Sequence, residues 1–418
     1  MLFYKKKQRR KTLAEKGQKK RIVGGCKNII LYSLYKLFPC CIILTYEAER
    51  PESGFFKEII MKKIGRQVLF IETSKGNPRN GEGAFMRLKN GSIMFGYTEF
   101  LGDSESWDDD ANARISVVFS EDEGETWSES QVLFEKSENS KNIMCLSFLR
   151  MNNDDIGAFY IVKNADGTDK IVLTRSADEG KTWSEPLSCM ECLEEQDYYV
   201  LNNDRVLKLK SGRIIFAVAR HTVHSGEDVF MPGELCFFIS DDDGATWQKT
   251  QTELKCPFEK DPDGYEEPGL YELSDGRIWC YIRTGLGWQF EAFSSDEGIT
   301  WSTPSPNMFF SSPCSPMLVK DCGKVTVAVF NPIPEHIMRD DEHLWGRTPY
   351  VLAVSTDRGE TFKKEKIFYL ENDPKNGYCY PAILQGEDYF LVAYYHSNNS
   401  GVCLDSTKIV KIMYDEII

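Results

Sequence analysis

The sequence predicts an all-β fold, a six-bladed β-propeller, and three observations support this prediction. A short turn sequence recurs five times at similar intervals along the chain. Apolar runs separated by polar or glycine turns precede each copy, and the 3.6-residue periodicity of amphipathic helices is nearly absent. The 418 residues, of which 41% are hydrophobic and 12% aromatic, suffice for the core of one large all-β domain.

The recurring turn has the pattern Ser-x-Asp-x-Gly-x-Thr-Trp, with Phe in place of Trp in the last copy, and is here called the Asp-box. In such a turn the Asp and Ser side chains bond to nearby backbone, and the glycine adopts a positive φ. The boxes therefore indicate architecture and not chemistry. Successive aspartates are 56, 64, 54 and 61 residues apart, in the segments Ser120–Trp127, Ser176–Trp183, Ser240–Trp247, Ser294–Trp301 and Ser355–Phe362.

A repeat of about 60 residues fits one four-stranded blade of a propeller. In each unit one apolar run follows a polar or glycine turn, as in LKNGSIMFGY and LKLKSGRIIFAVA. A later run leads directly into the box, as in ISVVF and KIVLTR. At this length per unit, the chain after residue 60 divides into about six blades.

Residues 1–60 lack the repeat and differ from the rest in charge. They contain 14 Lys and Arg against 5 Asp and Glu, whereas the remainder contains 36 against 59. A basic run followed by an apolar stretch is the order found in signal peptides and membrane anchors. Lys36 and Pro39 interrupt that stretch, which is short for a membrane span, and we favour translation from Met61. We therefore expect residues 1–60 to lie outside a propeller of residues 61–418.

Composition also bears on partners and location. The strongly acidic body argues against nucleic-acid binding, which needs a basic face. The 13 cysteines have no regular spacing, and Cys189-x-x-Cys192 lacks a second ligand pair, so we expect no metal site. Free cysteines favour the reducing cytoplasm, with export or anchoring as the alternative if residues 1–60 are a genuine signal or anchor. No cofactor and no stable membrane partner are expected.

The segment from Tyr265 to Trp301 predicts a polar site. Its first residues include the carboxylate pair Glu266 and Glu267, and a hairpin signal then leads to Arg283 and to an Asp-box. A carboxylate and an arginine at the ends of neighbouring strands can share one site. Because the body is acidic, an anion can bind only where arginines cluster locally.

The five boxes, in number and spacing, resemble the bacterial neuraminidase repeats of the sialidase superfamily, over about residues 70–415. The resemblance implies three arginines that bind a sugar carboxylate, a tyrosine nucleophile, a glutamate that activates it and an aspartate acid/base. The anomeric carbon of such a sugar carries a carboxylate that would repel a charged nucleophile, so a tyrosine suits the reaction. The planar arginine fork pairs bidentately with carboxylate. No metal or cofactor is implied.

Four positions match the family pattern in part. Glu267-Pro, followed sixteen residues later by Arg283, is similar to the family's glutamate–arginine segment. Arg347, in GRTPYVLAVSTDRGETF, precedes a strand and a box, where the third arginine belongs. Arg79, in NPRNGEGAFMRLKNG, lies near the place of the first arginine, although the family's Arg-Ile-Pro tripeptide is absent.

The same resemblance gives two candidates for the aspartate acid/base and two for the tyrosine nucleophile. Asp109 or Asp110 stands just before the strand that leads to the first box, where the acid/base belongs. Tyr380, in GYCYPAILQGEDYFLVAYY, fits the late nucleophile, and Tyr378 is the reserve.

Arg205 and His221 bracket another blade hairpin and are further substrate-binding candidates. The sequence also departs from the family where an arginine often follows the first GSIMFGY-type strand, because Tyr97, Thr98 and Glu99 stand there. This departure leaves the leaving-group side and the identity of the sugar open.

The predicted function is that of a retaining exo-glycosidase which releases a terminal acidic sugar from glycoconjugates. One alternative is another glycosidase or a polysaccharide lyase on the same propeller, with His221 and a tyrosine as a base pair. Another is a carbohydrate-binding propeller without activity, which would keep the aromatic residues and lose the coupled Glu and Tyr. Residue by residue, the alternatives are that the arginines are strand-end surface charges, the aspartates part of a solvated loop and the tyrosine part of the core or rim. The combination of Glu267, Arg283 and Arg347 favours an enzyme for an acidic sugar.

Overall fold

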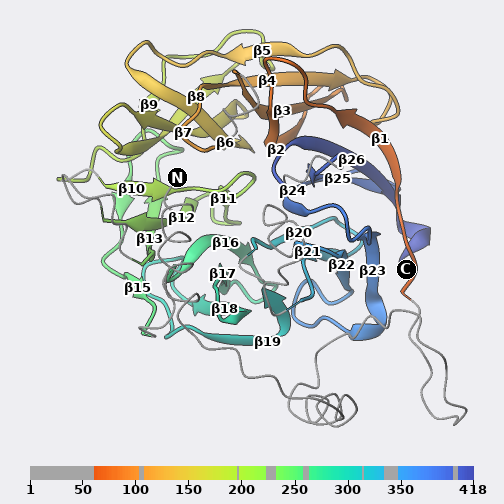
Figure 1. The fold of residues 1–418 in the computed structure, drawn as a ribbon. Helices are drawn as coiled ribbons and strands as arrows, with labels where there is room; N and C mark the ends of the chain where they lie inside the picture. Colours follow the sequence, from red (N-terminus) through yellow and green to blue (C-terminus); the bar gives the residue numbers. More distant parts are fainter. Residues whose placement is uncertain are drawn as a thin grey trace, which may run out of the picture.

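The computed structural model of the protein describes residues 61–102, 108–194, 197–222, 232–257, 263–312, 315–333, 347–398 and 403–418. These residues form six antiparallel sheets arranged around a common axis (Figure 1). Within them, the helical segments are two short 3-10 turns, Lys364–Lys366 and Tyr414–Glu416. The prediction of an all-β, six-bladed propeller is confirmed. The expectation for residues 1–60 concerns a segment outside the described residues.

Each blade runs from an innermost strand at the axis to an outermost strand at the rim. Blade I consists of β2 (Arg79–Arg87), β3 (Ile93–Phe100), β4 (Ala113–Ser120) and β5 (Gln131–Phe134). Blade II consists of β6 (Ser140–Arg150), β7 (Ile156–Asn164), β8 (Asp169–Ser176) and β9 (Leu187–Ser188). Blade III contains β10 (Tyr198–Val200), β11 (Leu207–Lys208), β12 (Ile214–His221), β13 (Glu234–Ser240), β14 (Gln248–Lys249) and β15 (Leu254–Lys255).

The second half of the ring is built in the same way. Blade IV consists of β16 (Glu266–Glu272), β17 (Ile278–Arg283), β18 (Gly287–Ser294) and β19 (Ser305–Ser312). Blade V consists of β20 (Leu318–Asp321), β21 (Thr326–Phe330), β22 (Tyr350–Ser355) and β23 (Ile367–Glu371). Blade VI combines β24 (Tyr378–Gln385), β25 (Tyr389–His396) and β26 (Ser406–Met413) with β1 (Arg66–Ile71) from the other end of the chain.

The pairing of β1 with β26 closes the ring. The two strands run antiparallel, with Arg66 opposite Lys411 and Ile71 opposite Thr407. This closure also explains why five boxes serve six blades. In blades I to V the box joins the third strand to the fourth, whereas in blade VI these two strands come from opposite ends of the chain.

The Asp-boxes form the local bonds that their sequence predicts. In the third box, Asp242 Oδ1 accepts hydrogen bonds from Thr246 N and Ser240 Oγ, both at 2.8 Å, and Asp242 Oδ2 accepts one from Thr246 Oγ1 at 2.6 Å. The Trp247 indole donates to the Gly244 carbonyl at 3.2 Å. The other four boxes repeat the aspartate bonds. Because these bonds stay within one turn, the boxes shape the blade edge and carry no chemistry.

The core is divided among the blade interfaces. Six hydrophobic clusters of the described residues lie one between each pair of neighbouring blades, so that every blade is packed on both faces. The cluster between blades II and III, for example, contains Phe159, Phe216 and Trp247, and the Trp247 side chain comes from a box. Burial of both faces of a sheet explains the long apolar runs seen in the sequence.

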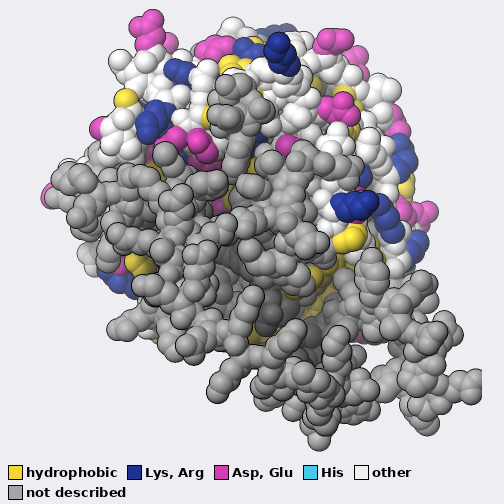
Figure 2. Space-filling model, viewed as in Figure 1, with side chains coloured by type: hydrophobic (Ala, Val, Ile, Leu, Met, Phe, Trp, Pro, Cys, Tyr) yellow, Lys and Arg dark blue, Asp and Glu magenta, His cyan; other side chains and the backbone are white. Residues whose placement is uncertain are grey.

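Strand direction separates the two ends of the propeller. The innermost strand of a blade begins, and the second strand ends, at the same end of the axis, as the pairing of Arg79 with Phe100 and of Glu266 with Arg283 shows. The hairpin turns between these strands lie at the opposite end. The described part of the chain contains no helix with the length and apolar character of a membrane span. On the described surface seen in Figure 2, acidic and basic side chains are interspersed and do not form one large patch of a single sign.

We propose that residues 1–60 are not needed for folding, and truncation tests this. A chain that begins at Met61 keeps β1 and the bond from Ile64 N to the Tyr369 carbonyl, 3.0 Å, so its thermal unfolding midpoint should match that of the full chain. A chain that begins at Thr73 lacks β1 and leaves β26 as an open edge, so its midpoint should fall markedly and aggregation should rise. Equal loss of soluble expression in both truncations would contradict the proposal.

Candidate active site

Most of the side chains predicted for the site lie where innermost strands begin and second strands end. Arg79 begins β2, Glu267 is the second residue of β16, Arg283 ends β17 and Tyr380 is the third residue of β24. The closed ring brings these strand ends, up to about 300 residues apart in sequence, to one end of the axis.

Bulges in the innermost strands aim several of these side chains. The strand register shifts at Glu267 in β16 and at Tyr380 in β24, and both residues have positive φ, 39° and 54°. Glu82 in β2 and Cys145 in β6 stand at equivalent bulges, with φ of 53° and 61°. A side-chain-bearing residue in this region is strained, at a cost of about 1–3 kcal/mol, and such strain is concentrated at functional sites.

Tyr380 and Glu267 are joined directly. The Tyr380 hydroxyl donates to Glu267 Oε1 at 2.7 Å, and Arg283 Nη1 donates to Glu267 Oε2. The Arg347 guanidinium lies 5.4 Å from the centre of the Tyr380 ring. One carboxylate therefore links the tyrosine hydroxyl to an arginine, with a second arginine beside the ring.

The pKa shifts of Glu267 and Tyr380 indicate which of the two holds the proton between them. Burial opposes ionisation of Glu267, but the charge and hydrogen bond of Arg283 outweigh burial and lower the pKa of Glu267. Burial, together with the charge of Glu267, raises the pKa of Tyr380 well above its usual value. The pair therefore rests as an ionised carboxylate that accepts from a neutral phenol.

Arg79 is fully occupied by neighbours. Its guanidinium donates from Nε to the Tyr395 hydroxyl at 2.8 Å, from Nη1 to Asp109 Oδ1 at 2.7 Å and from Nη2 to Glu82 Oε1 at 2.6 Å. Arg79 is only 1% exposed. The charges of Arg79 and Lys163 lower the pKa of Asp109 to about 2. Sequence analysis identified neither Glu82 nor Tyr395.

Blade II holds the loop that carries the two candidate aspartates. The Asp109 carbonyl accepts from Asn142 Nδ2 at 2.8 Å and from Lys163 Nζ at 2.9 Å. The Asp109 side chain is 56% exposed and contacts Arg79, whereas the Asp110 side chain is 66% exposed, with Lys141 and Lys163 at 3.6 and 3.7 Å. Of the two, Asp109 thus has the direct connection to the arginines.

Arg347 is anchored by a pair of thiols. Its Nη1 donates to Cys379 Sγ at 3.1 Å, and Cys379 Sγ lies 3.7 Å from Cys403 Sγ. Both cysteines are fully buried. Nothing in the irregular cysteine spacing indicates this contact, because it depends on β24 meeting the segment before β26 in blade VI.

Tyr378 and His221 each contact neighbours other than Glu267 and Tyr380. Tyr378 is fully buried in the cluster between blades V and VI, and its hydroxyl donates to the Asp373 carbonyl at 3.4 Å. The tyrosine hydroxyl that bonds to Glu267 is therefore that of Tyr380. His221 Nε2 lies 3.5 Å from Glu266 Oε2, and its ring centre lies 5.9 Å from that of Tyr198.

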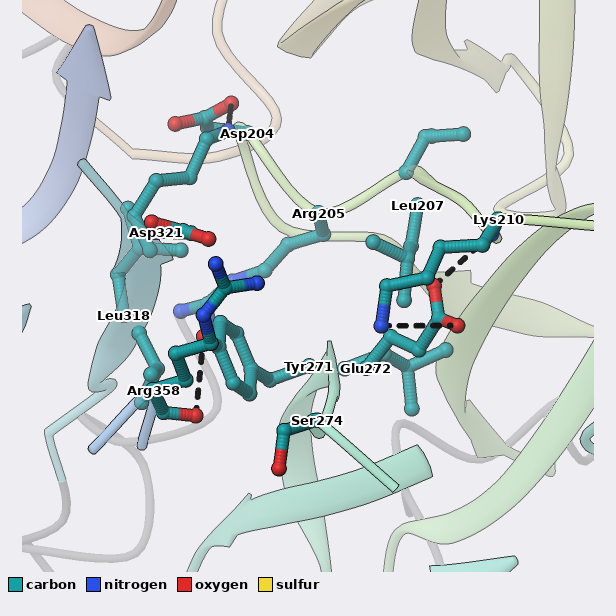
Figure 3. A pocket seen from close by; sticks show the side chains of 14 residues that line it. Asp204, Arg205, Leu207, Lys210, Tyr271, Glu272, Ser274, Leu318, Asp321 and Arg358 are labelled. Atoms are coloured by element: carbon teal, nitrogen blue, oxygen red, sulfur yellow. Dashed lines mark hydrogen bonds and ion pairs between the residues drawn. The ribbon is translucent and has the colours of Figure 1, made fainter. Parts of the chain in front are cut away.

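Arg205 lies deeper along the axis. Its Nη1 donates to the Tyr281 hydroxyl at 2.9 Å. It lines a cavity of about 250 Å³ together with Lys210, Ser274 and Arg358, which stand in hairpin turns and in the fifth box (Figure 3). These turns are at the end of the propeller opposite Glu267. The Arg205 guanidinium itself lies between the two ends, beside Gly269 of β16 and Tyr281 of β17, each two residues from a candidate, Glu267 or Arg283.

The ion pair between Asp109 and Arg79 predicts a pH-dependent difference in stability. The folded pKa of Asp109, about 2, lies below the unfolded value of about 3.9, so its stabilising contribution is complete above about pH 4 and is lost as the pH falls toward 2. Asp109→Asn should therefore lower the thermal midpoint at pH 5–7, and its gap to the native protein should close as the pH falls. Asp110→Asn is the matched control, with a smaller gap because its nearest cation is 3.6 Å away. A gap for Asp109→Asn that is independent of pH would contradict the ion pair.

Comparison with known proteins identifies the family. The model of a BNR repeat-like domain matches residues 101–394. A curated relative, sialidase B of Streptococcus pneumoniae, is 31% identical over 119 residues, which are 28% of this chain and only 15% of that protein's length.

Three solved structures share the fold. A protein of unknown function from Dyadobacter fermentans has a TM-score of 0.63 at 20% identity, over 83% of this chain and 99% of its own. The NanB sialidase of Streptococcus pneumoniae has a TM-score of 0.64 at 15% identity, over 85% and 71% of the two chains. A leech intramolecular trans-sialidase has a TM-score of 0.65 at 14% identity, with the same coverage. Because the family model spans most of the propeller, the chain belongs to the family of BNR repeat-like domains, within the sialidase superfamily.

Proposed function

We propose that this protein is an exo-glycosidase that releases a terminal acidic sugar, sialic acid or a close analogue, from glycoconjugates. The observation that carries the proposal is the 2.7 Å hydrogen bond from the Tyr380 hydroxyl to Glu267. A buried tyrosine with an ionised carboxylate as its acceptor is the arrangement that turns a phenol into a nucleophile. The sialidases and trans-sialidases among the structural relatives are consistent with this chemistry.

The proposed reaction has two displacements. Tyr380 attacks the anomeric carbon while Glu267 accepts its proton, and the bond to the leaving oxygen breaks as Asp109 donates a proton to that oxygen. A water molecule then attacks the same carbon, with Asp109 accepting its proton and the tyrosine leaving with the proton held by Glu267. Two inversions give net retention of configuration.

The arginines define the substrate's charge in this proposal. Arg283 and Arg347 flank the tyrosine, and Arg79 lies on the other side with its nitrogens bound to protein groups. A substrate carboxylate would reach Arg79 by replacing Asp109, whose side chain is 56% exposed. Once separated from Arg79, Asp109 loses the interaction that lowers its pKa and becomes able to carry a proton.

The nucleophile can be tested by removing a single hydroxyl. Tyr380→Phe keeps the ring and removes the nucleophile, so kcat on a fluorogenic sialoside should fall by orders of magnitude with an unchanged thermal midpoint. Glu267→Gln should cause a similar loss because an amide cannot take the proton. The matched control is Tyr378→Phe, which should keep kcat because the Tyr378 hydroxyl bonds to a backbone carbonyl in the core. The assignment fails if the Tyr378 variant is inactive and the Tyr380 variant is active.

The arginine clamp can be tested through substrate affinity. Arg283→Ala or Arg347→Ala should weaken binding of an acidic sugar by about 2–5 kcal/mol, the loss found when one member of a buried charge pair is truncated. Arg277→Ala is the control. Arg277 lies in the turn at the other end of the same hairpin, its side chain is 40% exposed, and it pairs with Asp275. Near-normal KM in both site variants would contradict the proposal that Arg283 and Arg347 bind the substrate carboxylate.

A polysaccharide lyase is the second candidate, because the rings of His221 and Tyr198 are neighbours and Glu266 lies 3.5 Å from His221. Product analysis over a panel of sialosides, uronides and neutral glycosides separates the possibilities. Hydrolysis adds the mass of one water, a lyase creates an ultraviolet-absorbing double bond, and an intramolecular transfer gives an anhydro sugar without added water. Sugar binding without turnover would indicate a binding propeller.

A further inference from the structure

Glu82, like Glu267 and Tyr380, has a positive φ at a bulge of an innermost strand. We propose that Glu82 is a positioning residue that orients Arg79 and limits the affinity of the site for an anionic sugar. This inference rests on the proposed function and adds a specificity-determining group to the same site.

The Glu82 side chain is buried and tightly packed beside Arg79. Its side chain is 3% exposed, Oε1 accepts from Arg79 Nη2 at 2.6 Å, and Oε2 lies 3.5 Å from Cys145 Sγ. The flanking residues are Gly81 and Gly83. A Cβ at Gly81 would lie 2.0 Å from the Tyr395 ring, and one at Gly83 would lie 2.4 Å from a carbonyl oxygen. This packing retains a strained residue and fixes its carboxyl group against Arg79.

Two carboxylates contact Arg79, and they differ in exposure. Asp109 comes from a loop with its side chain 56% exposed, whereas Glu82 is buried in β2. A substrate carboxylate can displace Asp109 but not Glu82. The charge of Glu82 therefore stays in the site during binding, where it holds the guanidinium in one orientation and also repels the incoming anion.

Orientation and repulsion respond differently to substitution. Glu82→Gln keeps the shape and an oxygen acceptor for Arg79 Nη2 but removes the charge, so anion binding should tighten. Glu82→Ala removes both the charge and the acceptor and leaves a space beside Arg79, so anion binding should weaken. A residue with a purely structural role would shift both variants in the same direction.

Charge at Glu82 also predicts a pH effect. The groups that face Glu82 are Arg79 on its own strand, Asp109 on the β3–β4 loop, Cys145 on β6, Glu267 on β16 and Tyr395 on β25. Burial raises the pKa of Glu82, Arg79 opposes this, and Asp109 and Glu267 raise it further, with a raised pKa as the result. As the pH rises, Glu82 ionises and KM for an anionic sugar should increase in the native protein.

The experiment measures kcat and KM for an acidic glycoside, and binding of the free acidic sugar by calorimetry, over a range of pH. Glu82→Gln should lower KM by about threefold to tenfold and remove its rise with pH, and Glu82→Ala should raise KM by a similar factor. Glu272→Gln is the matched control, because it removes one charge from an innermost strand at the other end of the axis and should leave KM unchanged.

The outcomes separate this inference from the proposed function. If the folded native protein neither binds nor cleaves an acidic sugar, the proposed function fails and takes the role of Glu82 with it. If the native protein cleaves such a sugar but the Gln and Ala variants shift KM in the same direction, or neither shifts it, only the role of Glu82 is overturned. If the Ala variant does not fold, the KM of the Gln variant and its dependence on pH decide the matter.

Discussion

The antiparallel pairing of β1 with β26 is the constraint on which the rest of the structure depends. It joins the two ends of the ring, so that the hydrophobic cluster between blades VI and I can form and these two blades can each be packed on both faces. The same closure places β24 and β25 of blade VI beside β2 of blade I, and Tyr395 of β25 contacts Arg79. Core packing and site geometry are thus consequences of one strand pairing.

The residues around the axis depend on local strain that this packing sustains. Glu82, Cys145, Glu267 and Tyr380 all have positive φ at bulges of innermost strands. Each bulge turns a side chain out of the alternating pattern of its strand and toward the other blades. An isolated hairpin would relax such a conformation, whereas a closed ring in which neighbours contact both faces maintains it.

The fold could be predicted from the sequence because its strongest signal is local. Every Asp-box bond joins residues at most four positions apart, so five boxes identify five blades without knowledge of tertiary contacts. The link between Glu267 and Arg283 is also local, since one hairpin joins them. Asn142 and Lys163 were not identified because their contacts with Asp109 depend on the packing of blade II against the β3–β4 loop. The local signals for Glu82 are its position between two glycines and three residues after Arg79, but residues three apart are not neighbours on a regular strand, and only the bulge in β2 brings them together.

The distribution of charge links recognition to catalysis. Each arginine that could hold a sugar carboxylate already has an anionic or polar partner: Glu267 for Arg283, Cys379 for Arg347, and both Glu82 and Asp109 for Arg79. An acidic protein can keep buried guanidinium groups without a ligand only if such partners neutralise them. An incoming carboxylate must therefore compete with the resident groups, and the most exposed of these is Asp109. Under the proposed function, the displaced competitor is the acid that the reaction needs, so binding of the correct anion and protonation of the leaving group become one event.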